Sequence, residues 1–140
     1  MNLFILNLNK AFDGHLTRNY LETLNLNSDV EVLDLSNKNI EAIEWTTFQN
    51  LKSLKILNLS DNKISSLDYR TFQGLTNLRE IKLFNNRLAT LDYRTFKGLS
   101  NLTHLDLSLN RFASLDYRTF QGLTSLIELE LDFNQLTSLE

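Results

Sequence analysis

The chain has 140 residues, a formal net charge of −3, no cysteine and no proline. So small a net charge, and a negative one, argues against nucleic acid binding, which depends on basic residues, and a chain without cysteine has no disulfides. The apolar run Leu3 to Leu6 is far shorter than the roughly 20 residues of a membrane-spanning helix, so we expect no membrane insertion within this chain.

Residues 1–29 do not follow the pattern of the rest of the chain, and we expect them to form an N-terminal capping segment. The run Leu3 to Leu8 predicts a short strand, Asp13 and Gly14 form a turn signal, and the period-two alternation over residues 21–26 predicts a half-buried strand. A cap covers the apolar edge of the first repeat, as stacked repeats require. The alternative is a degenerate repeat, because a similar Leu-x-Leu pair returns nine residues later.

Residues 30–140 repeat with a period of 24 residues. About four and a half copies begin at residues 30, 54, 78, 102 and 126. Each copy starts with a strand, and because side chains alternate across a strand, its paired leucines or isoleucines point inward. Successive strands are predicted to stack as a parallel sheet. The inward pairs are Leu33/Leu35, Leu57/Leu59, Ile81/Leu83, Leu105/Leu107 and Leu129/Leu131.

Later apolar positions of each copy are predicted to fill the interior, including an aromatic spine on the return segment. These positions are Ile40, Ile64, Leu88, Phe112 and Leu136; Ile43, Leu67, Leu91, Leu115 and Leu139; Phe48, Phe72, Phe96 and Phe120; and Leu51, Leu75, Leu99 and Leu123.

An asparagine recurs where the chain leaves each strand. Its carboxamide both donates to and accepts from backbone groups, so we expect adjacent copies to form a ladder. The first copy has Lys38 at this position, and there either Asn37 or Asn39 compensates or the turn is looser. The recurring residues are Asn62, Asn86, Asn110 and Asn134.

This skeleton resembles the leucine-rich repeat family, L-x-x-L-x-L-x-x-N-x-L, in its 24-residue class that continues L-P-x-x-x-F-x-x-L. The resemblance implies an α/β solenoid, a right-handed coil with a concave parallel sheet and a mostly irregular or short-helical convex side. The proline of the family pattern is Asp68, Asp92 and Asp116 here, with Glu44 in the first copy. Since aspartate at a helix N-terminus accepts backbone N–H bonds, a short helical turn is expected on the return segment.

The same class is similar to the ectodomains of Toll-like receptors, Slit-type guidance proteins and insect immune repeat proteins. This implies a non-catalytic protein-recognition module, extracellular or in a membrane-anchored ectodomain, without a cofactor. The lack of cysteine caps and of a clear signal peptide leaves a cytoplasmic setting open. Because the last copy stops before its phenylalanine, we expect a fragment of a larger receptor or secreted recognition protein. The alternative is a structural or self-associating scaffold that pairs through the uncapped C-terminal repeat.

Solvent-facing strand positions form columns that vary while the interior stays nearly constant, so these columns are free to serve recognition of a protein ligand. The exposed apolar group Phe84, Leu109 and Phe133 is the expected centre of the ligand patch. His104 lies between Glu80 and Glu128 in its column, an arrangement that would favour the charged imidazolium and make binding depend on pH. A freely solvated histidine without this role is the alternative that we favour. The expected binding residues on the concave face are Glu80, Lys82, Phe84, His104, Asp106, Leu109, Glu128, Glu130, Asp132 and Phe133.

Neither catalysis nor metal binding is predicted. His104, Asp106 and Ser108 share one strand face, but residues two apart are separated by roughly 6.6 Å, too far for a nucleophile and its base, which need about 2.6–3.2 Å. Asp106 also belongs to an acidic cluster with residues 128, 130 and 132, of the kind that holds calcium. We interpret this cluster as a solvated face in which Lys82 pairs with Asp106, because no loop fixes a binding geometry.

Two further patterns have structural interpretations that we favour. An aromatic column beside three arginines indicates a packing role in the repeat, with a convex binding stripe as the alternative. Two triplets match the N-glycosylation acceptor pattern, a pattern that arises often by chance in an asparagine-rich chain. The column is Trp45, Tyr69, Tyr93 and Tyr117 beside Arg70, Arg94 and Arg118, and the triplets begin at Asn58 and Asn101.

Overall fold

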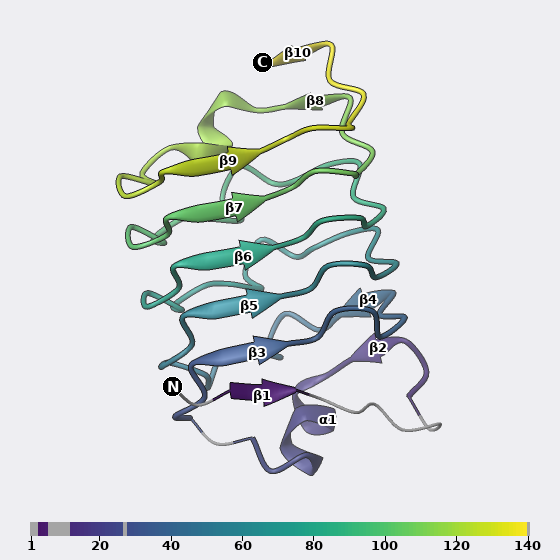
Figure 1. Ribbon diagram of the computed structural model, residues 1–140, viewed down its shortest axis with the longest axis vertical. Coiled ribbons are helices and arrows are strands. Elements are labelled where there is room, and N and C mark those ends of the chain that lie inside the picture. The colour runs from purple at the N-terminus through teal and green to yellow at the C-terminus, as the bar shows by residue number, and fades with distance from the viewer. Residues whose placement is uncertain (1–2, 6–11, 27, 140) are drawn as a thin grey trace.

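The computed structural model describes residues 3–5, 12–26 and 28–139, which wind into a solenoid of stacked coils (Figure 1). One strand from each coil joins a parallel sheet in the order β1-β3-β5-β6-β7-β9. The predicted solenoid with a parallel sheet along one side is confirmed. The strands are β1 (Leu3–Ile5), β3 (Val32–Asp34), β5 (Ile56–Asn58), β6 (Glu80–Lys82), β7 (His104–Asp106) and β9 (Glu128–Glu130).

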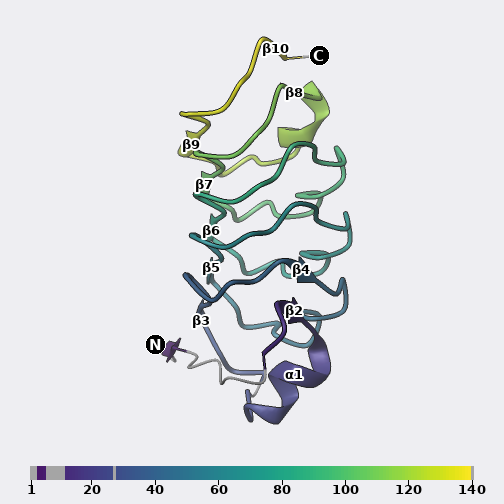
Figure 2. The same ribbon diagram turned by 90° about the vertical axis from the view of Figure 1, so that its right-hand side faces the viewer.

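The return segments run along the side opposite the sheet, and within the described residues they hold little regular structure (Figure 2). Two short parallel pairs join neighbouring coils where the chain leaves the sheet, β2 with β4 and β8 with β10. A 3-10 helix, η1 (Tyr117–Phe120), forms one return segment. The paired strands are β2 (His15–Leu16), β4 (Ala42–Ile43), β8 (Ser114–Leu115) and β10 (Ser138–Leu139).

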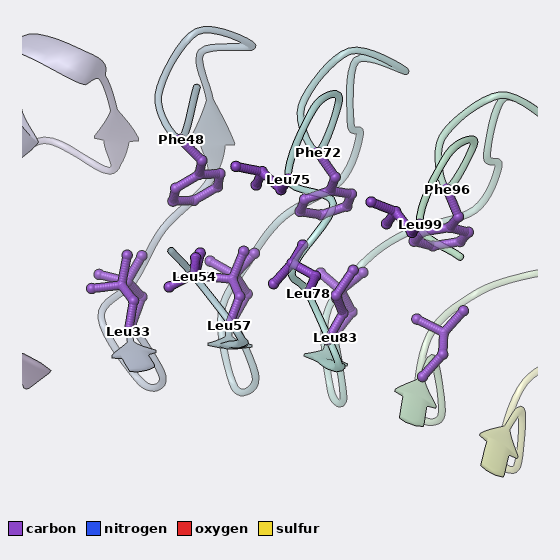
Figure 3. Packing of buried hydrophobic residues seen from close by; sticks show 14 of the residues in the cluster. Leu33, Phe48, Leu54, Leu57, Phe72, Leu75, Leu78, Leu83, Phe96 and Leu99 are labelled. Atoms are coloured by element: carbon purple, nitrogen blue, oxygen red, sulfur yellow. The ribbon is translucent and has the colours of Figure 1, made fainter. Parts of the chain in front are cut away.

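The core is a continuous column of apolar side chains inside the coils (Figure 3). Phe48, Phe72 and Phe96 are completely buried, which confirms the predicted spine. The rings of Phe72 and Phe96 stack with their centroids 6.1 Å apart, within the usual range for aromatic pairs. The inward strand pairs from Leu33 to Leu107 are buried as predicted.

The last coil and the return segment that precedes it depart from the predicted burial pattern. Leu129 is 36% exposed, and Leu131, Leu136 and Phe120 are half-buried. The reason is that an inward side chain is covered by the coils on both sides, and among the described strands β9 pairs with β7 alone. The side chain of Leu139 lies outside the described residues.

The N-terminal coil corrects another expectation. Residues 21–26 do not form a strand, because α1 (Arg18–Thr23) occupies this region, and the Thr17 hydroxyl caps it by accepting from the Tyr20 N–H at 3.1 Å. The helix buries Leu21 against the first coil. The predicted strand near residue 3 is present as β1, which pairs in parallel with β3, whereas residues 6–8 of that expected strand lie outside the described residues. Gly14 has φ +93, consistent with the predicted turn.

The return segments contain the helical turn expected from aspartate in place of proline. The Asp92 carboxylate accepts from the Arg94 N–H at 2.9 Å, and the Thr95 N–H donates to the Asp92 carbonyl at 3.0 Å. The same pair of bonds recurs at Asp68 and Asp116. Each aspartate therefore caps one tight turn, which η1 extends into a regular 3-10 helix.

The predicted asparagine ladder is present. The Asn86 amide nitrogen donates to the carbonyl of Leu83 in its own coil at 3.2 Å and to that of Leu59 in the preceding coil at 3.0 Å. Its oxygen accepts from the Ile64 N–H at 3.1 Å. In the first copy the oxygen of Asn62, from the following coil, accepts from the Lys38 N–H at 3.0 Å. The following coil therefore supplies the hydrogen-bond acceptor for the turn that lacks its own asparagine. Equivalent bonds occur at Asn62, Asn110 and Asn134.

Candidate binding face

The outward side chains of the sheet form the columns that the 24-residue period predicts. We call this surface, made by the outward residues of β3, β5, β6, β7 and β9 and of the turns that follow them, the sheet face. Ile56 pairs with Glu80, which pairs with His104, which pairs with Glu128. Parallel strands place such residues about 4.8 Å apart, so each column is a row of side chains from successive coils. The second column is Asp34, Asn58, Lys82, Asp106 and Glu130.

A hollow of about 380 Å³ lies on the sheet face over β6, β7 and β9. It brings together most of the predicted binding residues, because they come from adjacent columns of three neighbouring strands. Asp61 also belongs to the hollow, although it was not among the predicted binding residues. It occupies the same position in its copy as Asn85 and Leu109 do in theirs, and this position could have identified it. The hollow is lined by Ser60, Asp61, Glu80, Ile81, Lys82, Phe84, His104, Leu105, Asp106, Glu128 and Glu130.

Three predicted binding residues lie beside the hollow instead of in it. Leu109 and Phe133 occupy the turns after β7 and β9, and Asp132 precedes Phe133. The Leu109 N–H donates to the Asp132 carbonyl at 2.9 Å, so the two turns are neighbours. Of the predicted apolar group, Phe84 is half-buried in the hollow, Leu109 is 40% exposed and Phe133 is 79% exposed.

The turn position that holds Leu109 and Phe133 has a left-handed backbone in every copy. Its φ is +52 at Leu109 and +56 at Phe133. Asparagine and aspartate tolerate this conformation, whereas a bulky apolar residue is uncommon there. The same position in the earlier copies is Asn37, Asp61 and Asn85.

Some charged side chains of the hollow form an ion pair, whereas others lie beside charges of the same sign. Lys82 Nζ lies 3.0 Å from a Glu80 carboxylate oxygen, so the predicted pairing of Lys82 with Asp106 is wrong. Both side chains leave the same strand face two residues apart, and they lean along the strand toward one another. The pKa of Glu130 is raised above its ordinary value, chiefly by the Asp106 carboxylate and then by burial, Glu128 and Asp132, against the opposing effect of Lys82.

His104 meets only one of the two carboxylates that its column predicts. Its Nε2 lies 3.5 Å from Glu128, while Glu80 turns to Lys82. Its Nδ1 lies 2.8 Å from the Thr103 hydroxyl. The imidazole is therefore held through both of its ring nitrogens. Of the Glu80 and Glu128 carboxylates, it contacts only that of Glu128.

Two residues of the third column are buried, although this column was predicted to face solvent. The third column is Ser36, Ser60, Phe84, Ser108 and Asp132. Ser108 is 4% exposed and Ser60 is 7% exposed. The Ser108 hydroxyl and N–H both donate to the Asp106 carboxylate, and the Asn58 amide oxygen accepts from the Ser60 N–H at 3.0 Å. These bonds turn the chain inward at the ends of β5 and β7.

Within the described residues, His104, Asp106 and Ser108 are not arranged as a nucleophile with its base. The Ser108 hydroxyl donates to Asp106, and the His104 ring contacts Thr103 and Glu128 instead of Ser108. In the described ranges, no three His, Cys, Asp or Glu side chains lie close enough together to hold a metal ion.

On the return side, aromatic and arginine side chains from successive coils alternate in what we call the aromatic–arginine stack. Each arginine contacts the ring of the preceding coil and the aspartate of its own turn. Arg94 bonds Asp92 through two nitrogens, at 2.9 and 2.7 Å, and these bonds lower the pKa of Asp92 to about 2. The guanidinium-to-ring distances are 4.2 Å for Arg70 on Trp45, 3.9 Å for Arg94 on Tyr69 and 4.2 Å for Arg118 on Tyr93.

The two N-glycosylation triplets lie in different surroundings. Asn58 is half-buried within β5 on the sheet face, whereas Asn101 is exposed in a turn and its amide donates to the Thr76 carbonyl at 2.9 Å. A glycan on Asn58 would occupy the sheet face.

The sequence matches the family model described as Leucine rich repeat over residues 28–88 and 77–136. The chain belongs to the leucine-rich repeat family. No curated protein matches its sequence. None of the helices within the described residues has the length and apolar character needed to cross a membrane.

Solved leucine-rich repeat structures share the fold over most of the chain. The APL1 leucine-rich repeat domain is 29% identical over 99% of this chain, with a TM-score of 0.87. A chain of the LRIM1/APL1C complex is 30% identical over 90%, with a TM-score of 0.83, and a chain of the TLR13-ssRNA13 complex is 36% identical over 79%, with a TM-score of 0.72. The match spans 36%, 23% and 15% of the respective neighbour's chain.

Proposed function

We propose that this leucine-rich repeat chain is a non-catalytic protein-recognition module that binds its ligand on the sheet face over β6, β7 and β9. The hollow there is the observation that carries the proposal, because it gathers polar and apolar side chains from three coils on a fixed backbone. Rigid presentation lowers the entropy lost on binding. The core leucines and the asparagine ladder determine the fold, so the residues of the hollow are free to serve recognition.

The proposed ligand is a protein, in an extracellular or ectodomain setting within a larger recognition protein. The likeness to a chain of the LRIM1/APL1C complex supports a protein partner. A nucleic acid is a poor ligand for this face, although one neighbour was solved as the TLR13-ssRNA13 complex. Nucleic acid binding depends on lysine and arginine contacts to phosphate, and carboxylates predominate around Lys82.

Selection of peptides from a random display library on the native chain tests this proposal. The selected peptides are then measured against the double variant Phe84→Ser and Leu109→Asn, which introduces residues found at the same positions of other copies. We expect their affinity to fall at least tenfold, since apolar anchors dominate interface energetics. The matched control changes exposed Lys97 on the return side to Ala and should leave affinity unchanged. Equal binding to all three proteins would falsify recognition by the sheet face.

Self-association through the last coil is the second candidate, favoured by its exposed apolar side chains. Ile127 is 78% exposed, Phe133 79% and Leu129 36%. Neighbouring apolar side chains of this kind mark contact surfaces more often than scattered ones do. Light scattering over a range of concentrations distinguishes the candidates: a mass that rises with concentration and returns to that of a monomer in Ile127→Ser supports self-association.

A further inference from the structure

The sheet face has features that select the chemistry of its partner. We infer that it receives a protein segment that presents lysine or arginine side chains to the hollow and an apolar side chain to Leu109 and Phe133. This inference rests on the proposed function and adds to it the charge and polarity of the ligand.

The first step is the charge of the hollow. Five carboxylates and one lysine line it. The lysine is already engaged, because Lys82 Nζ lies 3.0 Å from Glu80. Complementary charge across an interface speeds association and excludes partners of the wrong sign. The carboxylates are Asp61, Glu80, Asp106, Glu128 and Glu130.

The second step is the crowding of like charges at the centre of this face. Asp106 and Glu130 are direct partners in the strand register, one strand spacing apart. The Asp106 carboxylate is the largest cause of the raised pKa of Glu130. A cation placed between them relieves this repulsion, and Lys82, turned toward Glu80, leaves that place to a ligand.

The third step is the apolar edge, which is independent of the carboxylates. Leu109 and Phe133 lie side by side in neighbouring turns, 40% and 79% exposed. Both occupy a left-handed position that is asparagine or aspartate in the other copies. Their side chains are disfavoured there by the backbone and gain little burial within the chain, whereas contact with an apolar partner side chain would bury them.

The spacing of the two features sets the size of the partner motif. Leu109 follows Asp106 by three residues, so the two lie at most roughly 10 Å apart, the length of three extended residues. A basic and an apolar side chain on one short segment span that distance. Exposed apolar residues flanked by acidic ones therefore fit a segment of mixed basic and apolar composition.

The probes are three blocked hexapeptides: one of alternating lysine and leucine, one of alternating glutamate and leucine, and one of alternating lysine and alanine. Titration into the isotope-labelled chain is followed by NMR at the backbone amides of Asp106, Leu109 and Glu130. We expect the lysine–leucine peptide to bind at least tenfold more tightly than either of the others. Its affinity should fall as salt rises, because salt screens exposed charges.

Two variants test the contribution of the carboxylates and that of the apolar edge separately. Glu130→Gln removes one carboxylate from the hollow and should weaken the lysine–leucine peptide about threefold to tenfold, whereas the matched Glu41→Gln, in an exposed position of the first coil, should not. Leu109→Asn should reduce the lysine–leucine affinity to that of the lysine–alanine peptide.

The inference is overturned if the glutamate–leucine peptide binds as tightly as the lysine–leucine peptide, if none of the three shifts these amides, or if Glu130→Gln and Glu41→Gln act alike. One result would overturn this inference without overturning the proposed function. Peptides selected from the random library that bind the sheet face without basic residues leave the proposed function standing and overturn this inference alone.

Discussion

The guanidinium carbon of Arg94 lies 3.9 Å from the centroid of the Tyr69 ring, one coil away, while two nitrogens of the same group bond Asp92. A cation over an aromatic face is attracted by the ring quadrupole. Since the carboxylate fixes the guanidinium, this contact couples adjacent coils outside the apolar core. The whole aromatic–arginine stack repeats this arrangement.

Stability should fall in acid because of these aspartates. Asp92 has an ordinary pKa of 3.8 that the Arg94 bonds lower to about 2. A lowered folded pKa contributes stability above the unfolded value, which is lost as pH falls from about 3.8 toward 2. Urea unfolding midpoints at pH 6, 4, 3 and 2.5 should drop steeply for the native chain and less steeply for Asp92→Asn. An unchanged pH dependence in the variant would contradict the assignment.

Truncating the aromatic spine should be far more costly than truncating the stack. Phe96 is completely buried, whereas Tyr93 is 42% exposed. Phe96→Ala opens a cavity and should cost about 3–5 kcal/mol of unfolding free energy. Tyr93→Ala removes chiefly the contact with Arg118, worth roughly 0.5–1 kcal/mol at an exposed site. Chemical denaturation of both variants makes the comparison, and similar losses would refute the assignment of inside and outside on the return segment.

The buried ladder asparagines should matter more than exposed ones that make a similar bond. Asn110 is 7% exposed, and its amide bonds the Leu83 carbonyl at 2.9 Å and the Leu88 N–H at 3.0 Å. Asn110→Ala leaves buried backbone groups unpaired, each costing about 1–3 kcal/mol. The control Asn101→Ala loses one bond, at the surface, and should cost no more than about 1 kcal/mol. Hydrogen exchange at the Leu88 amide should accelerate in the first variant alone.

Replacing Phe133 with asparagine should stabilise the chain. Its φ of +56 suits asparagine, and at 79% exposed the phenylalanine contributes little burial. We expect a gain of up to about 1 kcal/mol from relief of the left-handed strain. The comparison variant Phe84→Ser lowers stability instead, because Phe84 is half-buried. A lower melting temperature for Phe133→Asn would show that the side chain packs within the fold.

The sequence predicted the columns of the sheet well, because a constant period fixes the register wherever one face is buried. It failed at Leu21, where the period-two alternation suggested a strand and the Thr17 cap together with burial of that leucine favours a helix. It also failed at Leu129, since burial in a stacked array depends on the next coil and not on the residue. The sequence could not predict the ion-pair partner of Lys82, because strand register does not specify how side chains lean along a strand.

The asparagine ladder allows whole 24-residue units to be added to the chain or removed from it. Each amide bonds its own coil and the one before it at positions that every coil supplies, as Asn86 bonds Leu59 and Asn110 bonds Leu83. Removal of residues 78–101 would bring Asn110 to the Leu59 carbonyl and restore the same bonds. The number of coils can therefore change by whole units without a new fold, and each unit gained or lost adds or removes one row of the sheet face.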